Sequence, residues 1–244
     1  MVNANITTKI TTKNIKQKCL EAFDLLKKNY KENYVFNVDL LNNEIAVDVI
    51  NSDFDRIEEI MRLDMVTYQH SKEVAMLAEK IADVFGINKE TVVVSALFHD
   101  LGKIFDERYS MEINFVNNTS LNNFKVEHVI INDIICELKK QIGKINGSLL
   151  EWHVVNVMTC HHDRKDDYKI SGYPHKKFVL GPSAQIIQIA DTYDAMKRRG
   201  IYQKHYSDGE IIDYLENSAE RGIYNRYFVK GLKKVLGYPV DLKL

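Results

Sequence analysis

The chain has only three cysteines among its 244 residues, Cys19, Cys136 and Cys160, and no two of them form a CxxC pair. An odd number of widely spaced cysteines argues against a disulfide framework and against a zinc site made of thiolates. The sequence also lacks an apolar run of 18 residues and the basic and apolar start of a secretory signal. We therefore expect no membrane span and a reducing, cytoplasmic location.

The chain also lacks an excess of charge of either sign, since 33 basic and 34 acidic residues leave a formal charge of -1. No overall field attracts a nucleic-acid polymer or an anionic membrane, so any phosphate site has to be local. Internal repeats and low-complexity linkers are missing too. With 45% apolar residues the chain can bury one sizeable core. We expect a main domain at residues 54–244 and an N-terminal helix and linker region at residues 1–53.

Apolar residues recur at helical spacing along most of the chain, which predicts an all-α helical bundle. Residues 34–50 allow a small strand pair or irregular packing, and residues 106–123 are predicted to form a loop near the site. Asn14, Asp53, Asn88 and Ser148 are the expected N-caps of four helices. The predicted helices cover residues 14–30, 54–62, 67–85, 89–98, 126–140, 149–160, 183–197, 208–217 and 224–236.

The adjacent residues His99 and Asp100 follow the apolar run 91–98, which predicts a helix that is apolar nearly all round and hence central. Burial of two such polar groups is costly unless something compensates, and a bound cation does so. Five histidines and two aspartates stand at the starts or ends of apolar predicted helices. They are His70, His99, Asp100, His128, His161, His162 and Asp191.

Helix ends of one bundle can converge on a single cavity, so these seven residues predict an internal metal site. Imidazoles and carboxylates without a thiolate suit two divalent first-row metal ions, with iron or manganese favoured and zinc, cobalt or nickel as alternatives. Taken singly, each residue also has an ordinary structural interpretation. His70 and His128 can be polar first-turn residues, His161 and His162 can form a solvated helix end, and Asp191 can pair with Lys197 or Arg198.

Six motifs, taken in order, resemble the HD-GYP branch of the HD-domain phosphohydrolases, from about residue 67 to about residue 236. They are His70-Ser71, His99-Asp100-Leu101-Gly102-Lys103, Glu127-His128, His161-His162-Asp163, Gly172-Tyr173-Pro174 and Ala190-Asp191-Thr192-Tyr193-Asp194-Ala195. The resemblance implies a helical bundle around a dinuclear metal centre that hydrolyses cyclic di-GMP to a linear dinucleotide. One metal would be held by His70, His99, Asp100 and Asp191, and the second by Asp100, His128, His161 and His162.

Asp100 would thus bridge the two metals. Two close cations can activate water and clamp a phosphate. Lys103, one turn after His99, would neutralise charge developing on that phosphate. Tyr173 would line the pocket and stack on a guanine.

The sequence departs from the family pattern at several positions. Val66 stands where some members carry a glutamate for a third metal, which favours two metals. The segment before Gly172 is longer than usual, and residues 200–203 replace the usual Arg-Pro-Tyr run. Arg198, Arg199 and Lys204 flank that replacement, and we expect phosphate contacts from these neighbouring positions.

Two other functions remain open from the sequence. One is a nucleotidase or another HD-type phosphohydrolase acting on a small nucleotide. The other is a non-catalytic effector that binds a nucleotide and signals to a partner. In each case the partner is a small nucleotide rather than a nucleic-acid polymer or a membrane, with a homodimer or a separate regulatory protein as further expected partners.

Overall fold

The structure is a computed structural model that describes residues 9–26, 41, 44–105, 118–162, 181–198 and 205–242. Within these ranges the chain contains helices and no strand, which confirms the predicted all-α fold. The helices are α1 (Ile15–Leu26), α2 (Glu44–Asn51), α3 (Phe54–Met61), α4 (Met65–Val84), α5 (Lys89–Phe98), the 3₁₀ helix η3 (Leu101–Phe105), α7 (Asn118–Gln141), α8 (Leu149–Cys160), α9 (Pro182–Arg198), α10 (Asp208–Glu220) and α11 (Arg226–Val235).

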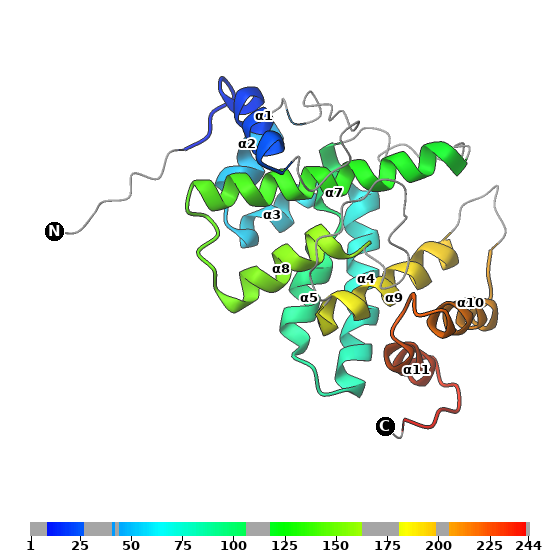
Figure 1. Ribbon diagram of the computed structural model, residues 1–244. Coiled ribbons are helices and arrows are strands. Elements are labelled where there is room, and N and C mark those ends of the chain that lie inside the picture. Colours follow the sequence, from blue (N-terminus) through cyan, green and yellow to red (C-terminus); the bar gives the residue numbers. More distant parts are fainter. Residues whose placement is uncertain are drawn as a thin grey trace.

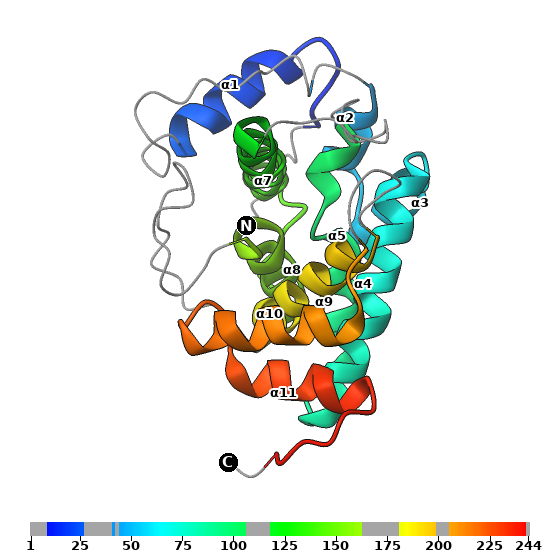
Figure 2. The same cartoon turned by 90° about the vertical axis from the view of Figure 1, so that its right-hand side faces the viewer.

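Helix α5 lies at the centre of the bundle and packs against α4, α8 and α9 (Figure 1). Its residues Val92, Ser95, Ala96 and Phe98 are buried, as expected for a helix with little polar surface. Helix α7 crosses one end of this group, with α1 and α2 packed against it, while α10 and α11 lie at the opposite end (Figure 2). The C-terminus of α5 therefore ends beside α7 and α8.

The N-terminal helices share a hydrophobic core with the rest of the bundle. Ile15 and Cys19 of α1 and Val49 of α2 belong to the same buried cluster as Ile130 and Ile134 of α7. Burial of this apolar surface holds α1 and α2 on α7. The domain boundary predicted at residue 53 stays a prediction.

Side-chain caps define several helix starts, and two of the four predicted caps are confirmed. Asn14 Oδ1 accepts from the Thr11 amide, before the start of α1. Asn88 accepts a hydrogen bond from the Thr91 amide, and Ser148 forms a capping box at the start of α8. Asp53 occupies the N-cap position of α3 but makes no side-chain cap. Its carboxylate instead lies 3.1 Å from Lys144 Nζ.

Two segments differ from the predicted secondary structure. Residues 44–51 form helix α2, rather than a strand pair or irregular packing, because Ala46, Val49 and Ile50 face the core at helical spacing. Helix α7 begins at Asn118, so residues 118–123 are helical and His128 is not in a first turn. The remainder of the predicted loop lies outside the described residues.

Two further features concern the cysteine side chains and the length of the apolar helices. Cys19, Cys136 and Cys160 are buried, and none of the three forms a disulfide. Among the described helices, none is both long enough and apolar enough to cross a membrane.

Candidate metal centre

His99 and Asp100 form the turn at the end of α5, and both are fully buried. The Lys103 amide donates a 2.9 Å hydrogen bond to the Asp100 carbonyl, which starts the 3₁₀ helix η3 directly after the pair. Asn132 Oδ1 on α7 accepts a 2.7 Å hydrogen bond from the Gly102 amide. The backbone on both sides of Asp100 is thus fixed, so its carboxylate has a defined direction.

The two oxygens of Asp100 face two different groups of side chains. On one side, Asp100 Oδ2 lies 3.3 Å from His70 Nε2 and 3.2 Å from His99 Nε2. Asp191 Oδ1 lies 3.1 Å from the same His70 nitrogen. We call this group, made of Asp100 Oδ2, His70, His99 and Asp191, the carboxylate half.

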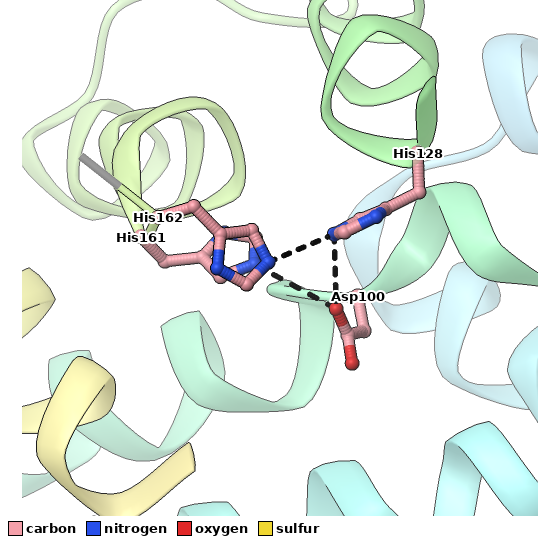
Figure 3. Close-up of side chains that lie close together, drawn as sticks. All are labelled: Asp100, His128, His161 and His162. Carbon is pink, nitrogen blue, oxygen red and sulfur yellow. Dashed lines mark hydrogen bonds and ion pairs between the residues drawn. The ribbon is translucent and has the colours of Figure 1, made fainter. Parts of the chain in front are cut away.

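On the other side, Asp100 Oδ1 lies 3.3 Å from His128 Nε2 and 3.6 Å from His161 Nε2. His162 Nε2 lies 3.2 Å from His128 Nε2, so three imidazoles converge on one carboxylate oxygen (Figure 3). Helix α7 supplies His128, and the end of α8 supplies the other two rings. We call Asp100 Oδ1 with these three histidines the imidazole half.

Two of the histidine rings are oriented by backbone carbonyls. His99 Nδ1 donates to Ala96 O at 2.7 Å, and His161 Nδ1 donates to Val157 O at 2.9 Å. A carbonyl can only accept, so in the neutral ring the proton is on Nδ1 and the Nε2 lone pair faces the centre. Among the described residues, His99 Nε2, His161 Nε2 and Asp100 Oδ1 are buried and make no hydrogen bond. Buried polar atoms without partners are costly, and one cation in each half would satisfy them, the first at His99 Nε2 and the second at Asp100 Oδ1 and His161 Nε2.

Burial and charge set the pKa values of the histidines differently in the two halves. Burial lowers the pKa of His99, but the charges of Asp100 and Asp191 outweigh burial and raise this pKa to about 9. Burial lowers the pKa of His128 to about 4, because Asp100 opposes it only in part. Burial likewise lowers the pKa values of His161 and His162. The imidazole half therefore holds neutral rings, which is the form that binds metal.

The carboxylates are held in their charged form despite burial. Burial raises the pKa of Asp100, but His99 and Lys103 outweigh it and bring the pKa well below its ordinary value. Burial also raises the pKa of Asp191, which His70 and His99 lower well below its ordinary value. Two negative charges and five imidazole rings in one buried cluster suit divalent cations.

Four side chains at the cluster are partly exposed, and they include His162 of the imidazole half. The side chains of His70 and Asp191 are 15% and 16% exposed, and that of Lys103 is 21% exposed. His99, Asp100, His128 and His161 lie behind them at 0–1%. Each half thus has a partly exposed member, and Lys103 is partly exposed beside Asp100.

Comparison with known proteins agrees with this geometry. A model of the HD domain matches residues 67–196, more than half of the chain, and spans the site from His70 to Asp191. The chain belongs to the HD-domain family. The HD-GYP branch stays a prediction, since the matching model is that of the HD domain in general. Gly172-Tyr173-Pro174 lies outside the described residues.

Several HD-domain relatives act on phosphodiesters, according to their names. The chain is 34% identical over 178 residues to Ribonuclease Y of Mycoplasmoides gallisepticum, matching 72% of this chain and 26% of that protein. It is 25% identical over 184 residues to 3'3'-cGAMP-specific phosphodiesterase 1 of Vibrio cholerae, matching 68% of this chain and 39% of that protein. It is 29% identical over 146 residues to Cyclic di-GMP phosphodiesterase of Thermotoga maritima, matching 57% of this chain and 37% of that protein. The chain thus spans well under half the length of each relative.

Solved structures share the fold. The HD domain of the Listeria monocytogenes phosphodiesterase PgpH aligns with a TM-score of 0.55 at 20% identity, over 74% of this chain and 94% of that one. The same domain in complex with cyclic di-AMP aligns with a TM-score of 0.51 at 19% identity, over 76% and 95%. At this identity the likeness shows the helical architecture alone.

The other site residues predicted from the sequence have separate outcomes. Lys103 Nζ contacts Asp100 Oδ2 directly, and its catalytic role stays a prediction. Arg198 pairs with Asp194 and lies 3.7 Å from Glu73, and its substrate contact stays a prediction. The substrate-binding residues Tyr173 and Arg199 lie outside the described residues.

Two residues that support the HD-domain site were missed in the sequence. Asn132 is fully buried and also donates to His99 O and Met158 O, both at 2.9 Å. It thus joins α5, η3 and α8 to α7, one turn after His128. Asp194 Oδ2 lies 2.6 Å from His70 Nδ1. Neither residue interrupts a helical pattern, so only the packing of separate helices reveals its role.

Proposed function

We propose that this HD-domain chain is a metal-dependent phosphodiesterase that opens a cyclic dinucleotide, cyclic di-GMP first among them, to a linear dinucleotide. The observation that carries the proposal is Asp100, whose two carboxylate oxygens face two separate sets of nitrogen and oxygen donors. The unpartnered, buried ligand atoms at its centre support the same conclusion. The names of the relatives support a phosphodiester bond as the target.

The seven residues would hold two divalent cations, with Asp100 shared between them. When bound, such a pair lowers the pKa of water and stabilises negative charge on a phosphate. The chain itself contributes rigid ligands, since backbone carbonyls fix the rings of His99 and His161. Lys103 contributes a positive charge at the exposed side of the site, where a phosphodiester would arrive.

A substrate panel tests the proposal on protein loaded with Mn²⁺ or Fe²⁺. The panel contains cyclic di-GMP, cyclic di-AMP, 3'3'-cGAMP, mononucleotides and a single-stranded RNA. We expect linear dinucleotide from cyclic di-GMP, loss of activity with chelator and recovery when metal returns. Lys103→Ala should lower kcat by roughly 10²–10³-fold, as removal of one electrostatic donor typically does. Lys72→Ala, an exposed lysine on α4, serves as the matched control.

The other outcomes assign other functions. Release of phosphate from mononucleotides alone would replace the proposal with a nucleotidase. Cleavage of the RNA alone would indicate a ribonuclease. The 34% identity to Ribonuclease Y makes a ribonuclease the main alternative among phosphodiesterases. Tight nucleotide binding without turnover by metal-loaded protein would indicate an effector.

A further inference from the structure

His70 differs from His99 and His161 in the group that orients its ring. The rings of His99 and His161 donate from Nδ1 to neutral backbone carbonyls. His70 Nδ1 instead lies 2.6 Å from a carboxylate oxygen of Asp194, on α9. Because that carboxylate accepts from Nδ1, the Nε2 atom of His70 faces Asp100 and Asp191.

The side chain of Asp194 is itself held in place by the guanidinium group of Arg198. Arg198 Nε, one turn later on α9, lies 2.8 Å from Asp194 Oδ1 and 2.7 Å from Oδ2. The same guanidinium lies 3.7 Å from Glu73 on α4, which accepts a 2.8 Å hydrogen bond from Gln69. The Asp194 side chain is 13% exposed, so the pair is only partly screened by water. Arg198 thus fixes the carboxylate that fixes His70.

We propose that Asp194 is a positioning residue that selectively strengthens metal binding by the carboxylate half, and that Arg198 acts through Asp194. A carboxylate that accepts from a ligating histidine locks the ring and makes its other nitrogen a better donor. Asp194 also adds a negative charge next to the His70 ligand. The inference rests on the proposed function, because it requires that His70 binds metal.

The proposal gives Arg198 a role different from direct contact with a substrate phosphate. If Arg198 contacts substrate, its loss raises KM while metal affinity stays constant. If Arg198 acts through Asp194, its loss weakens the binding of one metal ion while KM at saturating metal stays constant. The two measurements together therefore decide between the roles.

The experiment titrates Co²⁺ or Mn²⁺ into metal-free protein and follows both binding steps by calorimetry and, for Co²⁺, by absorption. Wild-type protein should bind two ions. Asp194→Ala should weaken one step by about 10–100-fold, the usual cost of losing such an outer partner, and leave the other step within a few-fold. Asp194→Asn keeps an acceptor and should fall between. Arg198→Gln should weaken the same step by a smaller factor. Because this variant keeps the contact between Asp194 and His70, it still tests the proposal if the Asp194 variants do not fold.

A double-mutant cycle identifies the half that is affected. In a His70→Ala background Asp194→Asn should have no further effect on metal binding, whereas in a His128→Ala background its effect should persist. Asp208→Asn is the matched control. Asp208, at the start of α10, pairs with Lys197 and Tyr193 of α9, the helix that carries Asp194, and no contact with a ligand histidine is seen for it among the described residues.

Equal weakening of both steps, or unchanged binding in the Asp194 variants, would overturn the positioning role. An Arg198 variant with a raised KM and unchanged metal affinity would overturn its action through Asp194. A wild-type protein that binds no metal would instead remove the proposed function itself.

Discussion

Asp100 and Lys139 are both charged residues buried in the helical bundle, with 0% and 1% of their surface exposed. The ammonium of Lys139 donates to the carbonyls of Ile50, at 3.4 Å, and Ser52, where α2 ends, and lies 5.5 Å from the centre of the Phe54 ring. Carbonyls at a helix C-terminus are favourable partners for a cation. Asp100 Oδ1, by contrast, is buried among imidazoles without a hydrogen bond within the described chain.

The difference shows which buried charges indicate function. The backbone supplies hydrogen-bond acceptors for Lys139, so this residue connects the end of α2 to α7. The site around Asp100 leaves Asp100 Oδ1 and the Nε2 atoms of His99 and His161, at the ends of α5 and α8, without hydrogen-bond partners among the described residues, which stabilises nothing until a ligand binds. Unsatisfied atoms that converge are therefore a stronger sign of a site than burial of a charge.

Asp100→Ala should give the largest effect on the metal side of this comparison. Loss of the shared carboxylate leaves both sets of ligands incomplete and removes the charge that separates two cations. We expect elemental analysis to find neither metal. Phosphodiesterase activity should fall by more than the roughly 10²–10³-fold typical of losing one electrostatic donor. Full metal occupancy in this variant would contradict the dinuclear assignment.

His70→Ala and His128→Ala should each remove mainly one metal, because each ring belongs to one half. Elemental analysis should find one ion per chain in either variant, and Co²⁺ spectra of the two variants should differ, since one retained site has two carboxylates and the other three imidazoles. His153→Ala, a partly buried histidine early in α8, is the control and should keep both ions. Identical spectra for the two variants would show that the halves are not separate sites.

The sequence predicted the helices and their polar ends well, because apolar periodicity and caps are local features. Asn88 and Ser148 mark helix starts by hydrogen bonds within one turn. The sequence failed where partners come from distant segments. Asn132 and Asp194 lie inside helices, and their contacts with His99 and His70 arise only from packing. Helix α2 was missed because Val47 and Val49 alternate with polar residues, which resembles a strand.

Asn132→Leu tests a buried polar residue that, like Lys139, is satisfied by the backbone. The change keeps a similar volume but leaves the Gly102 amide and the carbonyls of His99 and Met158 without partners. Each such group costs about 1–3 kcal/mol, so we expect the free energy of unfolding to fall by about 3 kcal/mol or more. Urea denaturation of metal-free protein measures this loss without a contribution from metal binding. A change below about 1 kcal/mol would show that water or a shift of η3 replaces the bonds.

Lys139→Met should give the smallest effect and should appear in the pH dependence of stability. Burial lowers the pKa of Lys139 to about 8, against 10.5 for an exposed lysine. Between these values the unfolded chain holds a proton that the folded chain has lost. The free energy of unfolding therefore contains a term from Lys139 that rises with pH, by up to about 3 kcal/mol across the interval. The methionine variant lacks this term.

The free energy of unfolding of Lys139→Met minus that of wild type should thus decrease steadily between pH 7.5 and 9.5, whether the difference is positive or negative at pH 7. Burial raises the pKa of Cys19 to about 12, which works in the opposite direction above pH 9 but cancels between the two proteins. Lys140→Met, at the exposed neighbouring position, should leave the pH dependence unchanged. Metal content should stay at the wild-type value in both variants, because neither lysine lies in the metal centre. A constant difference between Lys139→Met and wild type across this pH range would mean that the carbonyls at the end of α2 keep the buried ammonium charged. The charged form of Lys139 would then cost no more to bury than the neutral form.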